Sequence, residues 1–313
     1  MNIIEVHQLL KKYDNYTALN NVNFSVRKGS IHGLLGPNGA GKSTLIRILN
    51  KILSFDRGKV IVDGKDITAI NLKKIGYLPE ERGLYKDCTI GYQLLYFARL
   101  KGVSKEKADD NINYWLKRLE IENWEKKYPF ELSKGMQQKV QFICSVIHNP
   151  LILFLDEPFS GLDPLNVQFF KEEIINLSHS GCTIILSTHN MQSVEELCDE
   201  ISFITKSNIM ITKTISSFKK EYNTEFRYEI QFRGNEKEFY SSIDKNFSIE
   251  KIEKIEELFV AILKPQPNIV TDQNDLNRLI CSVSDKVFIA AFQQKGLSLD
   301  QIFIRIVDDK IHS

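Results

Sequence analysis

Residues 36–45 read GPNGAGKSTL, and this stretch decides the fold. Its spacing is G-x-x-x-x-G-K-[ST], running from Gly36 to Ser43. The preceding residues, SIHGLL at 30–35, predict a short buried strand, and the following ones place apolar side chains at helical spacing. A strand, a glycine-rich loop and a helix in this order are the context of a phosphate-binding loop. We therefore predict an α/β fold built around such a loop.

The loop has the chemistry that phosphate groups require. Glycines let the backbone curl so that its N–H groups point inward at phosphate oxygens, and the helix start adds partial positive charge. Lys42 is expected to reach the β- and γ-phosphates, and the Ser43 hydroxyl is expected to bind Mg²⁺. A chance match to this pattern in a chain of ordinary composition is roughly one in a hundred. The loop thus predicts a nucleoside triphosphate site.

Two further apolar runs end in polar residues. LILFLDEP at 151–158 is apolar until Asp156 and Glu157, as expected of a buried strand in a parallel sheet, where ligands sit at the carboxyl end. We expect Asp156 to hold Mg²⁺ and Glu157 to polarise an attacking water. TIILSTHN at 183–190 predicts another strand of the same sheet. It brings His189 to the γ-phosphate side as a candidate partner of Glu157.

A second helix start offers another anion site. In ELSKGMQQKV, residues 131–140, Ser133 precedes a helical run and is a natural N-cap. Together with Gly135 it makes a helix end that is suited to a phosphate group. One nucleotide needs only one such end. The economical arrangement is therefore two copies of the domain, each of which supplies one end to each of two nucleotides.

Composition excludes several classes of protein. The chain has 313 residues, of which 26% are charged and 42% hydrophobic, and this predicts a globular protein of two or three domains. The net charge of +1 argues neither for nor against a nucleic-acid partner. Five scattered cysteines show no metal spacing, and without a secretory signal we expect a reducing cytosol. No apolar stretch approaches the ~18 residues that span a bilayer, so we expect another chain to make any membrane crossing.

Taken in order, the chain shows GPNGAGKST, LSKGM, LFLDEP, SGLD and STH. With these five motifs, residues 1–220 resemble the nucleotide-binding subunit of ATP-binding cassette (ABC) transporters. The resemblance implies the P-loop NTPase fold of an ABC ATPase with a helical insert subdomain, and an ATPase that uses ATP and Mg²⁺. In this family ATP closes a head-to-tail dimer, and hydrolysis reopens it.

The resemblance also implies roles for single residues. Tyr13, 23 positions before Gly36, matches the aromatic residue that stacks on adenine, and Ser160–Asp163 match the loop that touches the opposite subunit. Catalytic roles fall to Lys42, Glu157 and His189. The residues expected to contact the nucleotide are Tyr13, Gly36, Pro37, Asn38, Gly39, Ala40, Gly41, Lys42, Ser43, Thr44, Ser133 and Gly135.

Two places depart from the family pattern. Glu80, in IGYLPEERGLY, stands where the family has a glutamine that helps to bind Mg²⁺ and reports to the membrane subunit. Lys134 and Met136 replace a glycine and a glutamine of the signature LSGGQ, whereas Ser133 and Gly135 are retained. Both changes resemble the branch that serves exporters with separately encoded membrane subunits. The expected metal ligands are Ser43, Glu80 and Asp156.

Two domains are predicted. Residues 1–221 form the ABC ATPase nucleotide-binding domain, with a helical insert at about 89–148, and residues 222–313 form a small C-terminal α/β accessory domain. Within the insert, Ser104 is expected to cap the second helix. The C-terminal domain resembles an extension found on many exporter-type ABC ATPases, and it shows no catalytic constellation.

Alternating side chains at 226–232 predict a half-exposed strand of the C-terminal domain. ELFVAIL and KVFIAAF predict two more strands, with a helix at 273–284 between them. The run EKIEKIEE at 250–257 is interpreted as a solvated face. Near the end of the chain, Ser298 and Gln301 form a capping box, followed by an apolar stripe of Leu299, Ile302, Phe303 and Ile306.

Three classes of function are open on the sequence. The leading one is an ATP-hydrolysing subunit that powers export through a separately encoded transmembrane permease. It would act with a second ABC ATPase subunit, as a homo- or heterodimer, on the cytoplasmic, inner face of the cell membrane. The main alternative is a soluble ABC ATPase acting on DNA, ribosomes or another protein assembly. Such proteins usually carry two cassettes or a long coiled coil, neither of which is evident here, so no nucleic-acid partner is expected. A third class binds ATP without hydrolysing it, and Glu157 and His189 argue against it.

Overall fold

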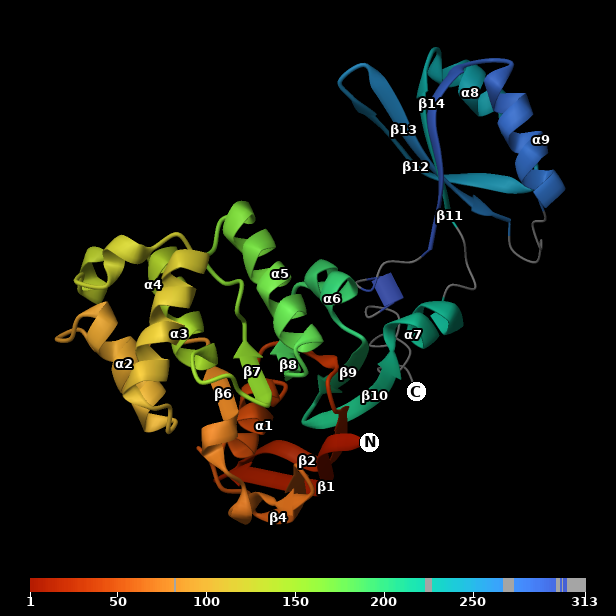
Figure 1. The fold of residues 1–313 in the computed structure, drawn as a ribbon. Coiled ribbons are helices and arrows are strands. Elements are labelled where there is room, and N and C mark those ends of the chain that lie inside the picture. The colour runs from red at the N-terminus through yellow and green to blue at the C-terminus, as the bar shows by residue number, and fades with distance from the viewer. Residues whose placement is uncertain (82, 223–226, 267–272, 297–298, 300, 303–313) are drawn as a thin grey trace. The chain divides into compact units, whose positions relative to one another are not determined.

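In the computed structural model, the glycine-rich loop follows an inner strand of a six-stranded sheet (Figure 1). The described residues are 1–81, 83–222, 227–266, 273–296, 299 and 301–302. Met1–Ile215 and Ser216–Ser313 form two compact units. The six-stranded sheet belongs to the first unit. Its strands, in sheet order, are β10 (Asn208–Thr214), β9 (Glu200–Thr205), β3 (Ile31–Leu35), β8 (Thr183–Ser187), β7 (Ile152–Asp156) and β6 (Ile75–Leu78).

The three strands predicted from apolar runs are confirmed. Every residue of β3, β7 and β8 is buried, which explains why these strands read as continuous apolar runs rather than as alternating ones. The strands from β9 to β6 pair in parallel, and β10 pairs antiparallel with β9 at the sheet edge. The carboxyl ends of β3, β7 and β8 therefore meet at one edge of the sheet.

A second, antiparallel sheet packs below the first. Its strands, in sheet order, are β2 (Tyr16–Arg27), β1 (Asn2–Tyr13), β4 (Arg57–Val62) and β5 (Lys65–Asp66). The helix after the glycine-rich loop, α1 (Lys42–Leu49), lies between the two sheets (Figure 1). Its apolar face joins one core with the inner residues of both sheets. This packing fixes the start of α1, and with it the loop.

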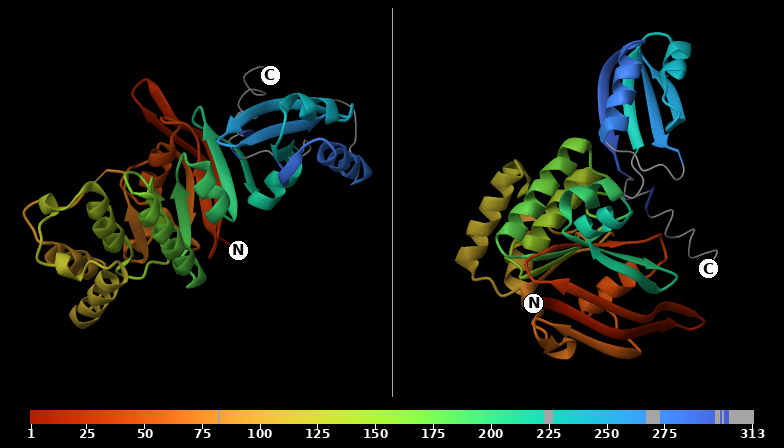
Figure 2. Two further views of the ribbon diagram at one scale, coloured as in Figure 1. Left: turned by 90° about the horizontal axis from the view of Figure 1, so that it is seen from above. Right: turned by 90° about the vertical axis from the view of Figure 1, so that its right-hand side faces the viewer.

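Helices cover the opposite face of the six-stranded sheet. Figure 2 shows α5 (Pro164–His179) and α6 (Met191–Leu197) on that side, away from the antiparallel sheet. Among the described residues, no helix has both the length and the apolar character that crossing a membrane requires.

The helical insert is present as expected. It contains α2 (Ile90–Leu100), α3 (Lys105–Arg118) and α4 (Lys134–Val146). The predicted cap at Ser104 is confirmed, because its hydroxyl accepts a hydrogen bond from the Lys107 N–H. Trp115, Phe142 and Phe170 form a chain of ring contacts from α3 through α4 to α5. This aromatic chain joins the insert to the rest of the first unit. Short 3-10 helices occupy Ile67–Ala69, Leu72–Lys74, Glu122–Trp124 and Pro129–Glu131.

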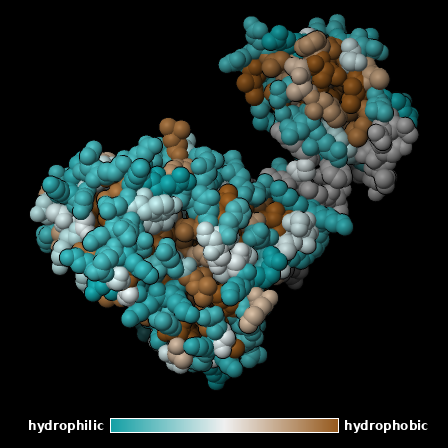
Figure 3. All heavy atoms as spheres, viewed as in Figure 1, coloured by the Kyte–Doolittle hydropathy of each residue, from teal (hydrophilic) through white to brown (hydrophobic). Residues whose placement is uncertain are grey.

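The second unit, which begins within α7 (Ile215–Tyr222), holds an antiparallel sheet with helices α8 (Glu236–Ser242) and α9 (Gln273–Ser284). Its strands, in sheet order, are β12 (Phe247–Ile255), β13 (Leu258–Pro265), β11 (Arg227–Arg233) and β14 (Phe288–Lys295). Alternate residues of β11 point to a core that both helices share. Partly buried apolar residues surround this core, and Figure 3 shows apolar side chains gathered on the pictured face of the unit.

The predicted helix at 273–284 and the three predicted strands of this unit are confirmed by α9, β11, β13 and β14. The interpretation of residues 250–257 as only a solvated face was incomplete. Most of these side chains are exposed, yet residues 250–255 belong to β12, and residues 251–255 pair with β13. The predicted capping box and the apolar stripe involve Ser298, Phe303 and Ile306, which lie outside the described residues, as does Phe226.

Candidate nucleotide-binding site

The sheet topology brings distant residues of the sequence to one place. β8 lies between β3 and β7, and Ser187 at its end pairs with both Leu34 and Asp156. The glycine-rich loop leaves β3 one residue after Leu35, so it lies beside the ends of β7 and β8. The sequence-predicted phosphate loop and the two acidic residues therefore share one sheet edge, where ligands of parallel α/β sheets bind.

Two glycines of the loop have no room for a side chain. A Cβ at Gly36 would come within 2.1 Å of the Ile204 carbonyl oxygen. Gly41, the N-cap of α1, has a φ of 109°, and a Cβ there would come within 2.5 Å of the Ala18 carbonyl oxygen. Glycine is required at both positions because the loop is pressed against β9 and β2.

Lys42 is the first residue of α1 and is buried. Its ammonium group donates hydrogen bonds to the carbonyl oxygens of Gly36, over 2.7 Å, and Pro37, over 3.1 Å. Burial lowers the pKa of Lys42, and the carboxylates of Glu157, Asp156 and Glu80 oppose this shift. The Lys42 ammonium group is thus held at the loop as a buried cation, where it can bind the anionic oxygens of a ligand.

Asp156 is the last residue of β7, and Glu157 follows it directly. The buried Asp156 carboxylate accepts a hydrogen bond of 2.7 Å from the Ser187 hydroxyl. Glu157 has a left-handed backbone conformation, with a φ of 49°, and its N–H donates to the Ser187 carbonyl oxygen over 2.9 Å. A non-glycine residue in this conformation is uncommon, and such residues cluster at functional sites.

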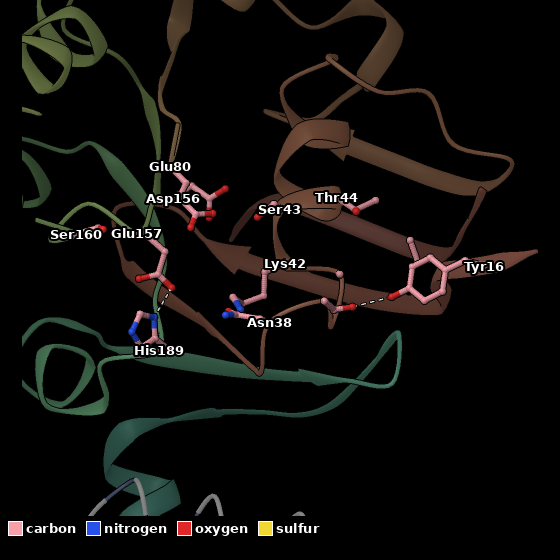
Figure 4. A pocket seen from close by; sticks show the side chains of 13 residues that line it. Tyr16, Asn38, Lys42, Ser43, Thr44, Glu80, Asp156, Glu157, Ser160 and His189 are labelled. Carbon is pink, nitrogen blue, oxygen red and sulfur yellow. Dashed lines mark hydrogen bonds and ion pairs between the residues drawn. The ribbon is translucent and has the colours of Figure 1, made fainter. Parts of the chain in front are cut away.

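The Glu157 carboxylate is held from two directions. The Thr188 hydroxyl donates to Oε2 over 3.2 Å, and Nδ1 of His189 lies 2.9 Å from Oε1. A carboxylate only accepts hydrogen bonds, so this contact favours a proton on Nδ1 of His189. Figure 4 shows the Glu157–His189 contact at one end of the cleft. The pairing of these two residues expected from the sequence is therefore present.

These groups line one cleft of about 340 Å³ (Figure 4). The structure brings together most of the residues expected at the site. The lining consists of Tyr16, Ala18, Asn38, Gly39, Gly41, Lys42, Ser43, Thr44, Glu80, Asp156, Glu157, Ser160 and His189. Gly36 and Pro37 were also expected at the site. They do not line the cleft, but their carbonyl oxygens accept hydrogen bonds from Lys42, which does. Ala40 is buried, and its N–H donates a hydrogen bond to the Pro37 carbonyl oxygen.

Two lining residues, Tyr16 and Ala18, had no role predicted from the sequence, and a third, Ser160, was assigned to the loop that touches the opposite subunit. The structure places Tyr16 in the cleft wall, whereas Tyr13 does not line the cleft and has its ring beneath the Lys11 ammonium at 5.2 Å. Tyr13 and Tyr16 pair directly across the tight turn that joins β1 to β2. Spacing alone does not distinguish two tyrosines on either side of one turn, and only the path of the hairpin does so.

The second predicted anion site, at the start of α4, is not part of the cleft lining. Ser133 is the N-cap of α4, and its hydroxyl accepts a hydrogen bond from the Met136 N–H, as the sequence predicts. Ser133 is exposed, and neither Ser133 nor Gly135 is among the residues that line the cleft. Gly135 lies against Gly161, in the loop that follows Ser160. The two predicted phosphate-binding ends are thus separate in one copy of the chain.

Comparisons with known proteins agree with this geometry. The ABC transporter family model matches residues 19–160. YhaQ of Bacillus subtilis (strain 168), described as an uncharacterized ABC transporter ATP-binding protein, is 41% identical over 220 residues, which are 70% of this chain and 74% of YhaQ. The lantibiotic transport ATP-binding protein SrtF of Streptococcus pyogenes is 36% identical over 211 residues, which are 67% of this chain and 90% of SrtF.

A solved structure of an ATP-binding subunit of an ABC transporter matches with a TM-score of 0.66 and 29% identity, over 70% of this chain and 93% of that one. The family match includes the glycine-rich loop, Glu80, Asp156 and Glu157. The chain belongs to the ABC transporter family, as an ATP-binding subunit with ATPase activity.

Proposed function

We propose that this chain binds MgATP in the cleft and that its hydrolysis powers export through a separately encoded membrane permease. The observation that carries the proposal is the gathering of Lys42, Asp156 and Glu157 around one cleft, with the Glu157 carboxylate fixed by Thr188 and His189. A cation for the phosphates and an oriented carboxylate for the water are two of the parts that recur in the hydrolysis of phosphoanhydrides.

Lys42 and the loop backbone bind the phosphates in this proposal. To reach them, the ammonium group gives up its bonds to Gly36 and Pro37 and exchanges neutral carbonyl oxygens for charged phosphate oxygens, which are stronger acceptors. The N–H groups at the start of α1 add their partial positive charge. Binding is therefore expected to depend on this one lysine.

Ser43, Glu80 and Asp156 fit a magnesium ion. All three line the cleft and offer only oxygen donors, which Mg²⁺ prefers. In the described part of the chain, no group of three or more His, Cys, Asp or Glu side chains is arranged to hold a metal by itself. This agrees with an ion that is bound jointly with nucleotide phosphates and water. Bound Mg²⁺ would offset the phosphate charge.

Glu157 orients and polarises the attacking water. Its fixed carboxylate, close to the loop, has the geometry of a general base or of a water-positioning group. His189 holds that carboxylate through Nδ1, and in this proposal its ring lies on the γ-phosphate side of the cleft. Tyr13 remains the residue that the family pattern proposes for adenine stacking, although Tyr16 and not Tyr13 lines the cleft.

A second ATPase subunit completes the site in this proposal. Ser133 and Gly135 lie at an exposed helix start outside the cleft of their own chain. Such an end can serve a nucleotide that is held by another copy of the chain or by a related subunit. Each closed dimer would then contain two nucleotides, and each would lie between a loop and a signature helix from different subunits.

Export through a permease is supported by the relatives and by the departures from the family pattern. SrtF is named for lantibiotic transport, and YbhF of Escherichia coli (strain K12), which is 32% identical over 222 residues, is named a probable multidrug ABC transporter protein. This chain covers 38% of YbhF. The sequences PEERGLY and LSKGM also resemble those of exporter-type subunits. The chain is accordingly proposed to act as a peripheral subunit on the inner face of the cell membrane.

The test combines ATP binding with recovery of the partner. In an equilibrium titration, Lys42→Ala is expected to abolish ATP binding, whereas the exposed-lysine control Lys28→Ala keeps wild-type affinity. A tagged wild-type chain, recovered from detergent-solubilised membranes of its native cells, is expected to carry a multi-spanning membrane protein. Recovery with ribosomes or DNA in its place would favour the soluble ABC ATPase. Unchanged ATP affinity in Lys42→Ala would contradict the site itself.

A further inference from the structure

A hydroxyl group from outside the glycine-rich loop bonds to the backbone of the loop. Tyr16 is the first residue of β2, and its Oη donates a hydrogen bond of 2.7 Å to the Gly39 carbonyl oxygen. Its ring forms part of the cleft wall, as Figure 4 shows. Neither the sequence motifs nor the proposed chemistry of the cleft gives Tyr16 a role.

The loop needs such a restraint because its own sequence supplies few. Gly36, Gly39 and Gly41 all have positive φ angles, of 158°, 78° and 109°. Gly36 and Gly41 are confined by close backbone neighbours, but a Cβ at Gly39 would meet only open space. Gly39 is therefore the part of the loop that packing restrains least, and glycine has the largest conformational freedom to lose on binding.

The Tyr16 bond is compatible with a bound nucleotide, unlike the bonds of Lys42. The Lys42 ammonium group holds the Gly36 and Pro37 carbonyl oxygens, but it is needed at the phosphates. A carbonyl oxygen such as that of Gly39 only accepts hydrogen bonds, so it has no favourable contact with a phosphate oxygen. A donor that occupies this carbonyl does not compete with the ligand. It also fixes the peptide plane to which the oxygen belongs.

We propose that Tyr16 is a positioning residue for ATP: its hydroxyl holds the Gly39 peptide so that the N–H groups of the loop are arranged for phosphates before the nucleotide arrives. This inference rests on the proposed binding of ATP in the cleft. It assigns the hydroxyl an effect on the phosphate end of the ligand that does not depend on the base. A preformed loop binds more tightly because less freedom is lost on binding.

The test removes the hydroxyl and keeps the ring. Tyr16→Phe is compared with Tyr240→Phe in α8, a tyrosine of matched exposure (49%, against 52% for Tyr16). In the full chain, ATP and inorganic tripolyphosphate, which lacks a base, each displace a fluorescent ATP analogue. We expect Tyr16→Phe to weaken both competitors by the same factor, about three- to tenfold, which corresponds to one net hydrogen bond. KM for ATP is expected to rise by that factor with kcat unchanged. Tyr240→Phe is expected to match the wild type.

Two results would overturn the inference. Wild-type affinity of Tyr16→Phe for both competitors would show that the bond does not prepare the loop. A loss confined to ATP, with tripolyphosphate unaffected, would mean that Tyr16 acts on the base. Lys42→Ala in the same assay separates this inference from the proposed function. If Lys42→Ala loses ATP while Tyr16→Phe binds like the wild type, only the role of Tyr16 fails, but if both variants bind normally, the site itself fails.

Discussion

Glu157, which lines the cleft, has a backbone conformation that costs free energy. Glu157 adopts a left-handed conformation, and the cost of such a conformation in a non-glycine residue is on the order of 1–3 kcal/mol. The structure holds it there through the Ser187 carbonyl oxygen and the Thr188 hydroxyl. The conformation turns the carboxylate toward His189 at the sheet edge. The abrupt change of chain direction after β7 therefore serves to orient the Glu157 carboxylate.

His148, which follows α4, makes the stability of the fold depend on pH. Its Nε2 lies 3.1 Å from the Ile75 carbonyl oxygen, and burial together with the nearby Lys101 lowers the pKa of His148 to about 4. In the unfolded chain its pKa is near the ordinary ~6.5, so between these values the unfolded state binds more protons. The free energy of unfolding is therefore expected to fall as the pH drops, by about 1–2 kcal/mol between pH 7 and pH 5.

Urea unfolding at pH 7 and pH 5 checks this expectation. His148→Gln keeps a group that can donate to Ile75 but does not titrate, so it should remove most of the difference between the two pH values. His7→Gln, at an exposed histidine, is the matched control and should keep the wild-type difference. Equal pH dependence in the wild type and in His148→Gln would mean that other groups carry the effect.

At the scale of elements, an ion pair ties the helical insert to the rest of the first unit. Arg118 of α3 donates from Nε and Nη2 to Oε1 of Glu173 in α5, over 2.9 and 2.6 Å. The Glu173 side chain is only 3% exposed, whereas that of Arg118 is 44% exposed. Removing the arginine leaves a nearly buried carboxylate unpaired, and solvent at the exposed partner moderates the loss.

We expect Arg118→Ala to lower the free energy of unfolding by about 1–3 kcal/mol. The control is Lys74→Ala, which removes an exposed pair with Asp63 at 3.6 Å and should cost less than about 1 kcal/mol. Chemical denaturation of the two variants measures the difference. Equally small losses of unfolding free energy in the two variants would show that burial of Glu173 does not make its pair with Arg118 more stabilising than an exposed pair.

Some strands of this protein can be predicted from the sequence, and others cannot. β3, β7 and β8 could be predicted because strands buried on both faces are apolar throughout, and the loop and the acidic corner follow from their positions at strand ends. β12 could not, because the charged residues of EKIEKIEE stay in solvent and only its pairing with β13 makes it a strand. Tyr16 was missed for a similar reason. Its contact with Gly39 joins residues 23 positions apart, and no local pattern encodes that contact.

The proposed role of Ser133 requires two copies of the chain or two related subunits. The test mixes two inactive variants, Lys42→Ala and Ser133→Arg. If Ser133 serves the partner's nucleotide, each mixed dimer has one doubly damaged site and one intact site. An equal mixture is then expected to regain about a quarter of wild-type phosphate release, since half of the dimers are mixed and each has one working site.

If Ser133 served its own cleft, every site in the mixture would carry one lesion and no activity would return. The control is a mixture of wild type with either variant, which shows whether a single intact site turns over alone. Labelled subunits establish that mixed dimers form. A silent mixture under these conditions would contradict the action of Ser133 across subunits.

The most direct test of ATP hydrolysis in this cleft is the Glu157→Gln variant, measured for both ATP binding and phosphate release. The variant keeps the size of the side chain and the Lys42 contacts, so ATP affinity should stay near that of the wild type. It removes the charge that polarises water, so phosphate release should fall by about 100-fold or more, and light scattering with MgATP should show a stable dimer. The exposed control Glu122→Gln should behave as the wild type. Wild-type phosphate release by Glu157→Gln would contradict the proposal that this cleft hydrolyses ATP through Glu157.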